Sequence, residues 1–228
     1  MSGSDRPRDR PVDRLVWVDC EMTGLDLGAD ALIEIAALVT NSNLDVLGDG
    51  LDIVIQPPAA ALAQMNEVVR KMHTTSGLLE ELDAGTTIAD AQEQVLAYVR
   101  QWVPEAGKAP LAGNTIATDR GFIARDLPLL DGHLHYRLID VSSLKELVKR
   151  WYPRVYYAAP VKSGGHRAMA DIMESLAELR YYRETVFVPL PGPDSDTARA
   201  SAATHVIAPA ATPDGTLDGA ERSEAGLH

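Results

Sequence analysis

The sequence contains no run of roughly 18 or more consecutive apolar residues, the length that a membrane-spanning helix requires. Its N-terminal stretch, MSGSDRPRDRPVDR, is polar and has no apolar core of the kind found in secretory signals. Cys20 is the single cysteine, which excludes a disulfide within the chain. These absences predict no membrane partner and favour a protein that works in the reducing cytoplasm.

Basic residues are also scarce, because 21 lysine and arginine residues stand against 33 aspartate and glutamate residues, for a formal net charge of −12. A protein that binds long duplex nucleic acid through a broad basic face needs a surplus of positive charge. The composition therefore predicts no long duplex as a partner. A small anionic substrate stays open, provided that metal ions supply positive charge locally.

Three compositional zones divide the 228 residues. Residues 1–13 are charged and contain proline, which predicts a mobile N-terminal tail. Residues 14–190 carry a periodic apolar pattern over a length that suits one domain. Residues 191–228 are rich in alanine, proline, aspartate, threonine and glycine and have almost no large apolar side chains, so we expect a disordered C-terminal tail.

The apolar pattern within the domain predicts five strands and a series of helices. Residues 14–20 (RLVWVDC) are typical of a strand buried on both faces, and residues 31–56 predict two strands joined by a turn around 41–45. Further strands are expected at 109–113 and 136–141. Helices are expected at 57–73, 76–85, 86–104, 114–128, 142–153 and 166–187. A hairpin followed by alternating strands and helices indicates an α/β fold with a mixed five-stranded sheet flanked by helices.

Asp19 and Glu21 lie at the end of the first predicted strand. Because side chains alternate along a strand, residues two apart point to the same face. Two carboxylates a few Å apart repel, and one takes up a proton unless a cation lies between them. A hard divalent ion such as Mg²⁺ or Mn²⁺ suits such oxygen ligands. The alternative is a solvated strand end in a chain that is acidic throughout.

Three further residues extend this candidate site. Asp119 follows a short strand near the start of a helix, where ligands collect in mixed sheets, although an acid there also suits the helix dipole. Asp171 lies at the margin of a packed helical stripe, where an acid either binds a metal or reaches water. His166 precedes it by five residues, which on a helix is roughly 140° away, so we expect His166 on the loop before the helix. A lone histidine is otherwise structural or merely exposed.

These residues in this order resemble the DEDDh 3′-to-5′ exonucleases. The strings WVDCEMTGLD, AGNTIATDRGF, HYRLIDVSSLKEL and AELRYYRE resemble the oligoribonuclease family in particular, and the similarity spans nearly all of residues 14–188. The resemblance implies a ribonuclease H-like fold and a 3′-to-5′ exoribonuclease that degrades very short RNA oligonucleotides, especially dinucleotides, to mononucleotides.

The resemblance also implies the chemistry of the site. Asp19, Glu21, Asp119 and Asp171 would hold two divalent metal ions, Mg²⁺ or Mn²⁺. A pair of such ions activates water and stabilises the leaving oxygen in phosphodiester hydrolysis. His166 would be the general base, a task that the ordinary pKa of histidine, around 6.5, suits near neutral pH.

Five substrate-binding residues follow from the same resemblance: Leu25, Thr115, Tyr136, Arg137 and Ser142. Leu25 resembles an apolar wedge against a base, and Thr115 stands where the family often has serine. Ser142 is expected to donate to a phosphate. One departure is Val68, which occupies a position where the family commonly has tryptophan and so removes an aromatic stacking face.

Tyr136 and Arg137 predict a homodimer. In the family this pair closes the pocket around the 5′ end, with the tyrosine supplied by the other protomer. Adjacent strand residues face opposite ways, so we expect two protomers, rather than one, to bring both side chains to one pocket. The alternative is that Tyr136 merely packs under a loop.

Two other functions stay open on the sequence alone. A DNA proofreading or tRNA-trimming exonuclease would share the four acids and the histidine but would differ in groove length and partners. A non-catalytic nucleic-acid-binding module would be expected to have lost at least one of these five residues.

Overall fold

The computed structural model describes residues 13–161 and 164–206 and divides into two compact units, which separate between Phe187 and Val188. Most of the predicted N-terminal tail, residues 1–12, and residues 207–228 of the predicted C-terminal tail lie outside the described residues. The division into one domain and two tails therefore stays a prediction.

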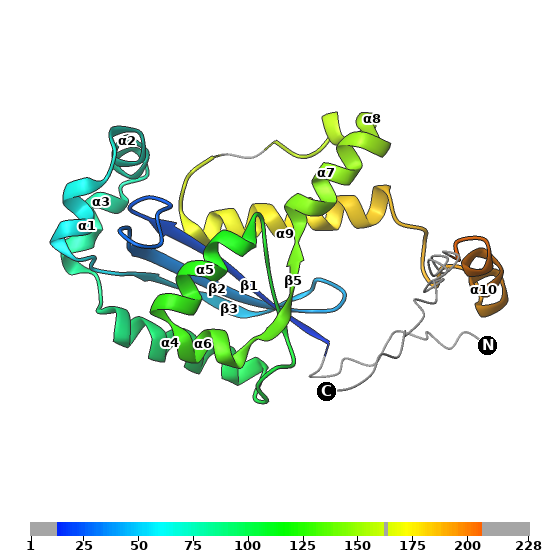
Figure 1. Cartoon of the computed structure of the whole chain (residues 1–228), viewed down its shortest axis with the longest axis horizontal. Coiled ribbons are helices and arrows are strands. Elements are labelled where there is room, and N and C mark those ends of the chain that lie inside the picture. Colours follow the sequence, from blue (N-terminus) through cyan, green and yellow to red (C-terminus); the bar gives the residue numbers. More distant parts are fainter. Residues whose placement is uncertain (1–12, 162–163, 207–228) are drawn as a thin grey trace, which may run out of the picture. The chain divides into compact units, whose positions relative to one another are not determined.

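The first unit is built on a five-stranded mixed sheet in the order β3-β2-β1-β4-β5 (Figure 1). Strand β1 pairs antiparallel with β2 and parallel with β4, while β2–β3 is antiparallel and β4–β5 is parallel. The strands are β1 (Arg14–Met22), β2 (Leu32–Asn41), β3 (Val46–Val54), β4 (Pro110–Gly113) and β5 (His135–Asp140). This confirms the predicted sheet.

Strand β1 is buried on both faces, as its apolar sequence predicts. Val16, Trp17 and Val18 have no exposed surface, and such continuous burial is expected for a central strand covered on both sides. The hairpin β2–β3 turns where it was expected, because the backbone N–H of Asn41 donates to the carbonyl of Asp45 at 3.0 Å.

Helices cover both faces of this sheet. One core contains side chains of β1 and β2 together with α4 (Ile88–Trp102), α5 (Ile116–Asp126) and α6 (Pro128–His133). The other packs the opposite face against α7 (Val141–Trp151) and α9 (Ala168–Thr185). Trp17 belongs to the second core and its neighbours Val16 and Val18 to the first. With a period of two, Asp19 and Glu21 therefore continue the face that carries α9.

Short helices complete the unit. They are α1 (Ala59–Gln64), α2 (Glu67–Thr75), α3 (Leu78–Glu81), the 3₁₀ turn η1 (Leu82–Ala84) and α8 (Pro153–Tyr157). A small separate core contains Ile33 of β2, Leu78 of α3 and Leu82 of η1. Leu62 of α1 packs against it. Asn66 caps α2 and Thr87 caps α4, each by accepting from a backbone N–H of the first turn. Helices α1, α2 and α3 border the end of β1 where Asp19 and Glu21 lie (Figure 1).

The second unit contains one described helix, α10 (Ser195–Ala203). The Asp194 side chain caps it by accepting from the N–H of Thr197 at 2.8 Å. None of its nine residues is buried. The helix lies in the segment for which the composition predicts disorder, and that disorder stays a prediction. Among the helices of the described residues, none is long and apolar enough to cross a membrane.

Candidate active site

The site begins where β1 runs past the end of β4. The parallel pairing of these strands involves Val16 and Trp17 of β1, so the backbone N–H of Cys20 lies beyond it. The Oδ1 of Asp119 accepts a hydrogen bond from that N–H at 3.0 Å. Asp119 is only 7% exposed, and it belongs to the first turn of α5. One buried carboxylate thus ties the start of α5 to β1 between the two acids of that strand.

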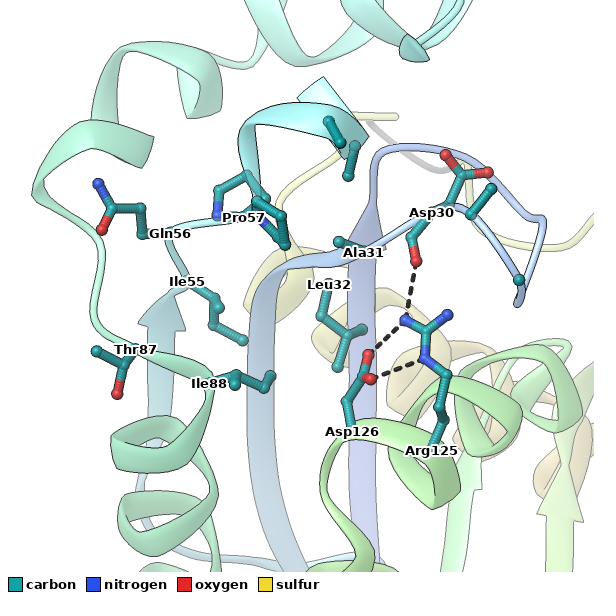
Figure 2. Close-up of a pocket in the computed structure, with 15 residues that line it drawn as sticks. Asp30, Ala31, Leu32, Ile55, Gln56, Pro57, Thr87, Ile88, Arg125 and Asp126 are labelled. Carbon is teal, nitrogen blue, oxygen red and sulfur yellow. Dashed lines mark hydrogen bonds and ion pairs between the residues drawn. The ribbon is translucent and has the colours of Figure 1, made fainter. Parts of the chain in front are cut away.

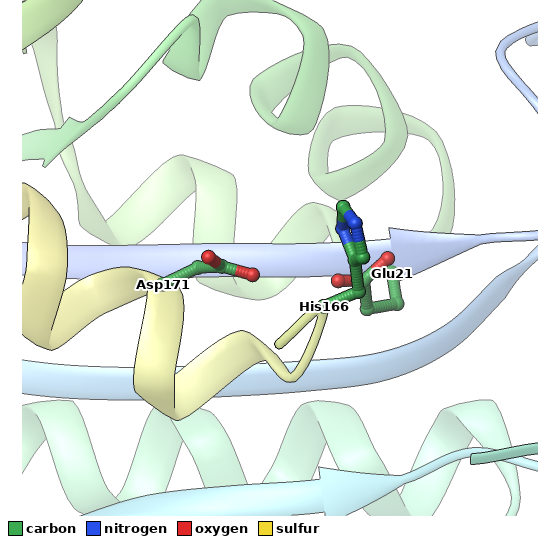
Figure 3. Close-up of side chains that lie close together, drawn as sticks. All are labelled: Glu21, His166 and Asp171. Carbon is green, nitrogen blue, oxygen red and sulfur yellow. The ribbon is translucent and has the colours of Figure 1, made fainter. Parts of the chain in front are cut away.

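His166 and Asp171 reach the same place from the other side. His166 lies on the loop before α9, as predicted, and Asp171 lies in the first turn of that helix. A ligand atom from each of Glu21, His166 and Asp171 lies within 4.8 Å of those of the other two (Figure 3). Residues far apart in the sequence therefore form one cluster in which Glu21 is buried and His166 is exposed.

The backbone at His166 is unusual. Its φ is 49°, in the left-handed region that costs a non-glycine residue roughly 1–2 kcal/mol. Such conformations persist where surrounding contacts over-determine them, and they cluster at functional sites.

The acids of the cluster strongly perturb one another. Burial, followed by repulsion from Asp119, Asp171 and Glu21, raises the pKa of Asp19 to about 9. Burial, with repulsion from Asp171 next in size, raises the pKa of Glu21 to about 8. Burial raises the pKa of Asp119 to about 7. Asp19 and Asp119 lie outside the closest triplet, but all four acids are near enough to repel.

This donor set fits a divalent metal ion. Several carboxylates share this buried place, and Arg167 lowers the pKa of one of them, Glu21. Oxygen ligands of this kind suit Mg²⁺ or Mn²⁺, and a bound cation would restore the ionised state that the chain alone disfavours. The predicted metal ligands therefore lie together, although the number and identity of the ions remain predictions.

Two residues of the site were missed by the sequence analysis. Glu34 of β2 is fully buried and stands directly opposite Glu21 across the β1–β2 pair. The signal for it was available, since an acid inside the apolar string ALIEIAALV needs a buried partner. That partner is Arg167, whose Nε lies 2.7 Å from Oε1 of Glu34.

His73 is the second missed residue. It is fully buried, and its Nε2 lies 2.9 Å from the carbonyl oxygen of Met22. A carbonyl only accepts, so Nε2 carries the proton and Nδ1 presents a lone pair, 3.9 Å from a carboxylate oxygen of Glu21. Burial lowers the pKa of His73, which keeps the ring neutral. No sequence signal distinguished it from an ordinary core histidine.

Thr115 and Ser142 meet, as expected for parts of one pocket. The hydroxyls lie 3.1 Å apart, and the N–H of Thr115 donates to Oγ of Ser142 at 2.9 Å. The Ser142 hydroxyl donates to Oδ1 of Asn114 at 3.0 Å. A pocket of about 420 Å³ opens here, lined by Thr115, Asp140, Ser142, Ser143, Glu146 and Leu147.

Tyr136 and Arg137 lie on the edge strand β5, and both are exposed. The guanidinium carbon of Arg137 lies 5.4 Å from the centre of the Tyr136 ring, which also stacks on His135 at 4.4 Å. The expectation that these neighbours face opposite ways is therefore wrong for the side-chain ends. The long arginine side chain is flexible enough to fold back over the ring, where the charge gains a cation–π contact. Neither residue belongs to the Glu21–His166–Asp171 triplet.

Leu25 protrudes from the loop after β1 with 73% of its surface exposed, as an apolar wedge would. The loop itself is firmly held. Arg125 donates to the carbonyl oxygen of Leu27. It also donates to the carbonyl oxygen of Asp30 and pairs with Asp126 (Figure 2). Asp30, Arg125 and Asp126 border a cavity of about 520 Å³ between α1, the start of α4 and the end of α5.

Val68 lies close to the general-base candidate. It is 79% exposed and lines a pocket of about 440 Å³ together with Lys71, Met72, Thr75, Ser76, Gly164, Gly165 and His166. Valine and methionine thus provide the apolar wall next to His166, in place of an aromatic ring.

Comparisons with known proteins show which family the chain belongs to. A family model described as an exonuclease, RNase_T, matches residues 16–179. An oligoribonuclease of Streptomyces coelicolor is 69% identical over 195 residues, which cover 86% of this chain and 98% of that protein. An oligoribonuclease of Rhodococcus jostii is 62% identical over 199 residues, covering 87% and 99%. The chain belongs to the oligoribonuclease family.

A solved structure supports the fold of this oligoribonuclease-family chain. The zinc-bound form of E. coli exonuclease I in complex with single-stranded DNA superposes with a TM-score of 0.61, at 14% identity, over 76% of this chain and 41% of that chain. At this identity the likeness concerns the fold alone. It confirms the predicted ribonuclease H-like class, and the family membership confirms the resemblance of the four motifs.

Proposed function

We propose that this oligoribonuclease-family enzyme is a 3′-to-5′ exoribonuclease that degrades very short RNA oligonucleotides, dinucleotides above all, to 5′-mononucleotides. One observation carries the proposal: the ligand atoms of Glu21, His166 and Asp171 meet within 4.8 Å in a chain 69% identical to an oligoribonuclease. The single cysteine, Cys20, supports the cytoplasm as the place of work.

The proposal assigns the metal ions to the four acids. Asp19, Glu21, Asp119 and Asp171 would hold two ions, Mg²⁺ or Mn²⁺, which when bound activate a water molecule and stabilise the leaving oxygen of an in-line displacement at phosphorus. Asp119 is oriented for this task by the N–H of Cys20.

His166 is the proposed general base. A ring nitrogen of His166 takes a proton from the attacking water as the new bond to phosphorus forms. The bond from phosphorus to the 3′-oxygen of the preceding nucleotide breaks, and that oxygen is protonated. The exposed position of His166 beside buried Glu21 lets it exchange this proton with solvent.

The proposal explains the preference for short RNA by a pocket that holds the 5′ end of the substrate. The pocket at Thr115 and Ser142 offers two hydroxyl groups. The guanidinium of Arg137 would bind a terminal phosphate through paired N–H donors. Leu25 would separate the two bases. A pocket that captures a 5′-terminal phosphate close to the scissile bond favours a substrate only a few nucleotides long.

The pocket at Val68 would take the 3′-terminal base. An aromatic platform contributes about 1–3 kcal/mol per base, and here Val68 and Met72 provide a smaller apolar wall instead. The proposal thus assigns less stacking to this end of the substrate, and Lys71 at the rim adds positive charge.

The proposal includes a homodimer through β5. This strand is one of the two edges of the described sheet, and large apolar side chains are exposed on it and on α7: Tyr136, Ile139, Leu147 and Trp151. An exposed strand edge with such neighbours is typical of a surface that another chain covers. Tyr136, 74% exposed, would then reach the pocket of the partner, while Arg137 serves its own.

Product analysis tests this function. RNA from two to about twenty nucleotides long, and DNA of the same lengths, would be digested with Mg²⁺ or Mn²⁺. The proposal predicts the fastest turnover on the dinucleotide RNA and 5′-mononucleotides as products. A rate that rises with length, or a preference for long DNA, would favour a proofreading exonuclease, and the absence of any hydrolysis would favour a non-catalytic module.

A further inference from the structure

Arg167, the residue immediately after His166, joins three parts of the fold. Its Nε lies 2.7 Å from Oε1 of Glu34 on β2. Its two terminal nitrogens donate to the two carboxylate oxygens of Glu81 at the end of α3, at 2.8 and 3.0 Å. Such a two-pronged contact fixes the plane of the guanidinium as well as its position.

Glu34 also fixes the first turn of α9. Its second oxygen, Oε2, accepts from the backbone N–H of Ala168 at 2.8 Å. Arg167, the residue at the N-cap position, makes no side-chain cap of its own, so a fully buried carboxylate of another strand takes that role. The start of α9 is thereby tied to β2 directly opposite Glu21.

His166 depends on this anchor. Gly164, with a φ of 64°, and Gly165 precede it, and glycine leaves the backbone free to adopt many conformations. His166 itself is exposed and held at a positive φ. Among the described residues, the hydrogen bonds of this segment begin one residue later, at Arg167.

We propose that Glu34, Arg167 and Glu81 form a clamp that positions the His166 ring relative to Glu21 and Asp171. The proposal rests on the proposed function, in which His166 is the general base. The three clamp residues are positioning residues, because they act on the reaction through His166. A base displaced by about 1 Å loses a large part of its contribution to the rate.

Glu81 offers the cleanest test of the clamp. Arg167 and Glu34 lie so close to the acids that their charges act on Glu21 directly. Glu81 is 45% exposed at the rim of the clamp, and Glu81→Gln keeps its size while weakening its hold on Arg167. Glu80→Gln removes the same charge from the preceding, exposed residue of α3 and serves as the matched control.

We expect Glu81→Gln to lower kcat by roughly 5- to 50-fold, with KM for the dinucleotide and the Mn²⁺ dissociation constant changed by less than about twofold. The Mn²⁺ affinity would be measured by calorimetry without substrate. Glu80→Gln should match the parent enzyme in all three quantities. An unchanged kcat for Glu81→Gln, or an equal loss in Glu80→Gln, would overturn the clamp.

A double-mutant cycle distinguishes positioning from general destabilisation. His166→Ala alone should lower kcat by roughly 10²–10⁴-fold. In that background Glu81→Gln should cause no further loss, since there is no ring left to position. A further loss of the same size would show that Glu81 acts on the fold or the metal site, which overturns the clamp. An unaffected kcat in His166→Ala would instead refute the proposed base itself.

Discussion

Asp19 shows at the scale of one residue why the site needs a cation. Burial, followed by repulsion from the neighbouring carboxylates, raises the pKa of Asp19 to about 9. Burial and repulsion thus oppose the ionised state that metal binding requires.

Asp19→Asn follows from this conflict. The substitution relieves repulsion and removes one metal ligand, so we expect most of the turnover to be lost while the metal-free protein stays folded and is at least as stable. Steady-state kinetics and thermal unfolding without metal would measure the two effects. A variant that cleaves at nearly the parent rate would show that Asp19 is not a ligand.

The raised pKa values also predict how metal binding depends on pH. The acids Asp19, Glu21 and Asp119, with pKa values of about 9, 8 and 7, hold protons that a metal ion must displace. Affinity for Mg²⁺ should therefore rise from about pH 6 to about pH 8, and calorimetry in two buffers would detect the released protons. Affinity that is independent of pH would contradict this account.

The stability of the metal-free protein should fall as the pH rises, whereas its affinity for Mg²⁺ should rise. Because these folded-state pKa values lie above the unfolded values near 4, the stabilisation by bound protons is complete below about pH 4 and is lost as the pH rises through about 7 to 9. Denaturant midpoints of the metal-free protein should therefore fall between about pH 4 and about pH 9. Asp19→Asn, which lacks the group with the highest pKa, should show a smaller fall.

Single residues also mark the limit of the sequence reasoning. Spacing of two along a strand correctly put Asp19 and Glu21 on one face, and the five-residue spacing from His166 to Asp171 correctly put His166 on a loop. Glu34 and His73 could not be assigned, because their partners, Arg167 and Glu21, are distant in the sequence. An apolar context announces that a polar residue needs a partner but does not say which one.

At the scale of elements, Asn114 joins helices α7 and α9 at the pocket of Thr115 and Ser142. Its amide nitrogen donates to Oγ of Ser175 on α9 at 2.7 Å and approaches a carboxylate oxygen of Glu178 at 3.3 Å. Its amide oxygen accepts from Ser142 at the start of α7. The long helix α9 is thereby linked to the hydroxyls that would bind the 5′ end.

Asn114→Ala should therefore loosen the 5′ end of the substrate. We expect KM for a 5′-phosphorylated dinucleotide to rise by about tenfold, the effect of losing roughly one charge-assisted hydrogen bond, with kcat changed much less. The matched substrate is the same dinucleotide with a 5′-hydroxyl, for which KM should change little. Equal effects on both substrates would mean that the network only supports the fold.

Long periodic elements were predictable, and short or unusual ones less so. The helix expected at 86–104 forms as α4, with its Thr87 cap, and the hairpin turns at Asn41 as expected. The start of α5 was placed at Asn114, whereas Thr115 is the cap, with a φ of 54°. The contact of the Arg137 guanidinium with the Tyr136 ring could not be predicted from alternation along the strand. Alternation fixes only the direction of Cβ and not the end of a long side chain.

At the scale of the whole molecule, the proposed homodimer predicts complementation between two inactive variants. Tyr136→Ala and Asp19→Asn proteins should each be nearly inactive alone. In a mixed dimer, the intact acids of the Tyr136→Ala chain would receive Tyr136 from the Asp19→Asn chain, which restores up to one site per dimer.

Light scattering and exchange of labelled subunits would show that mixed dimers form. The result that counts against the shared site is exchange of subunits without any recovery of activity. A mixture of Tyr136→Ala with the parent protein serves as the control, because it forms mixed dimers without removing an acid.

The central claim, that the buried acids form a metal-dependent site for hydrolysing very short RNA, is tested most directly by one initial rate. The rate is that of 5′-mononucleotide release from a 5′-phosphorylated RNA dinucleotide, measured with Mg²⁺ and again after EDTA. The account predicts rapid release with Mg²⁺, none above background with EDTA, and recovery when Mg²⁺ is added back. Release that continues undiminished in EDTA would contradict it.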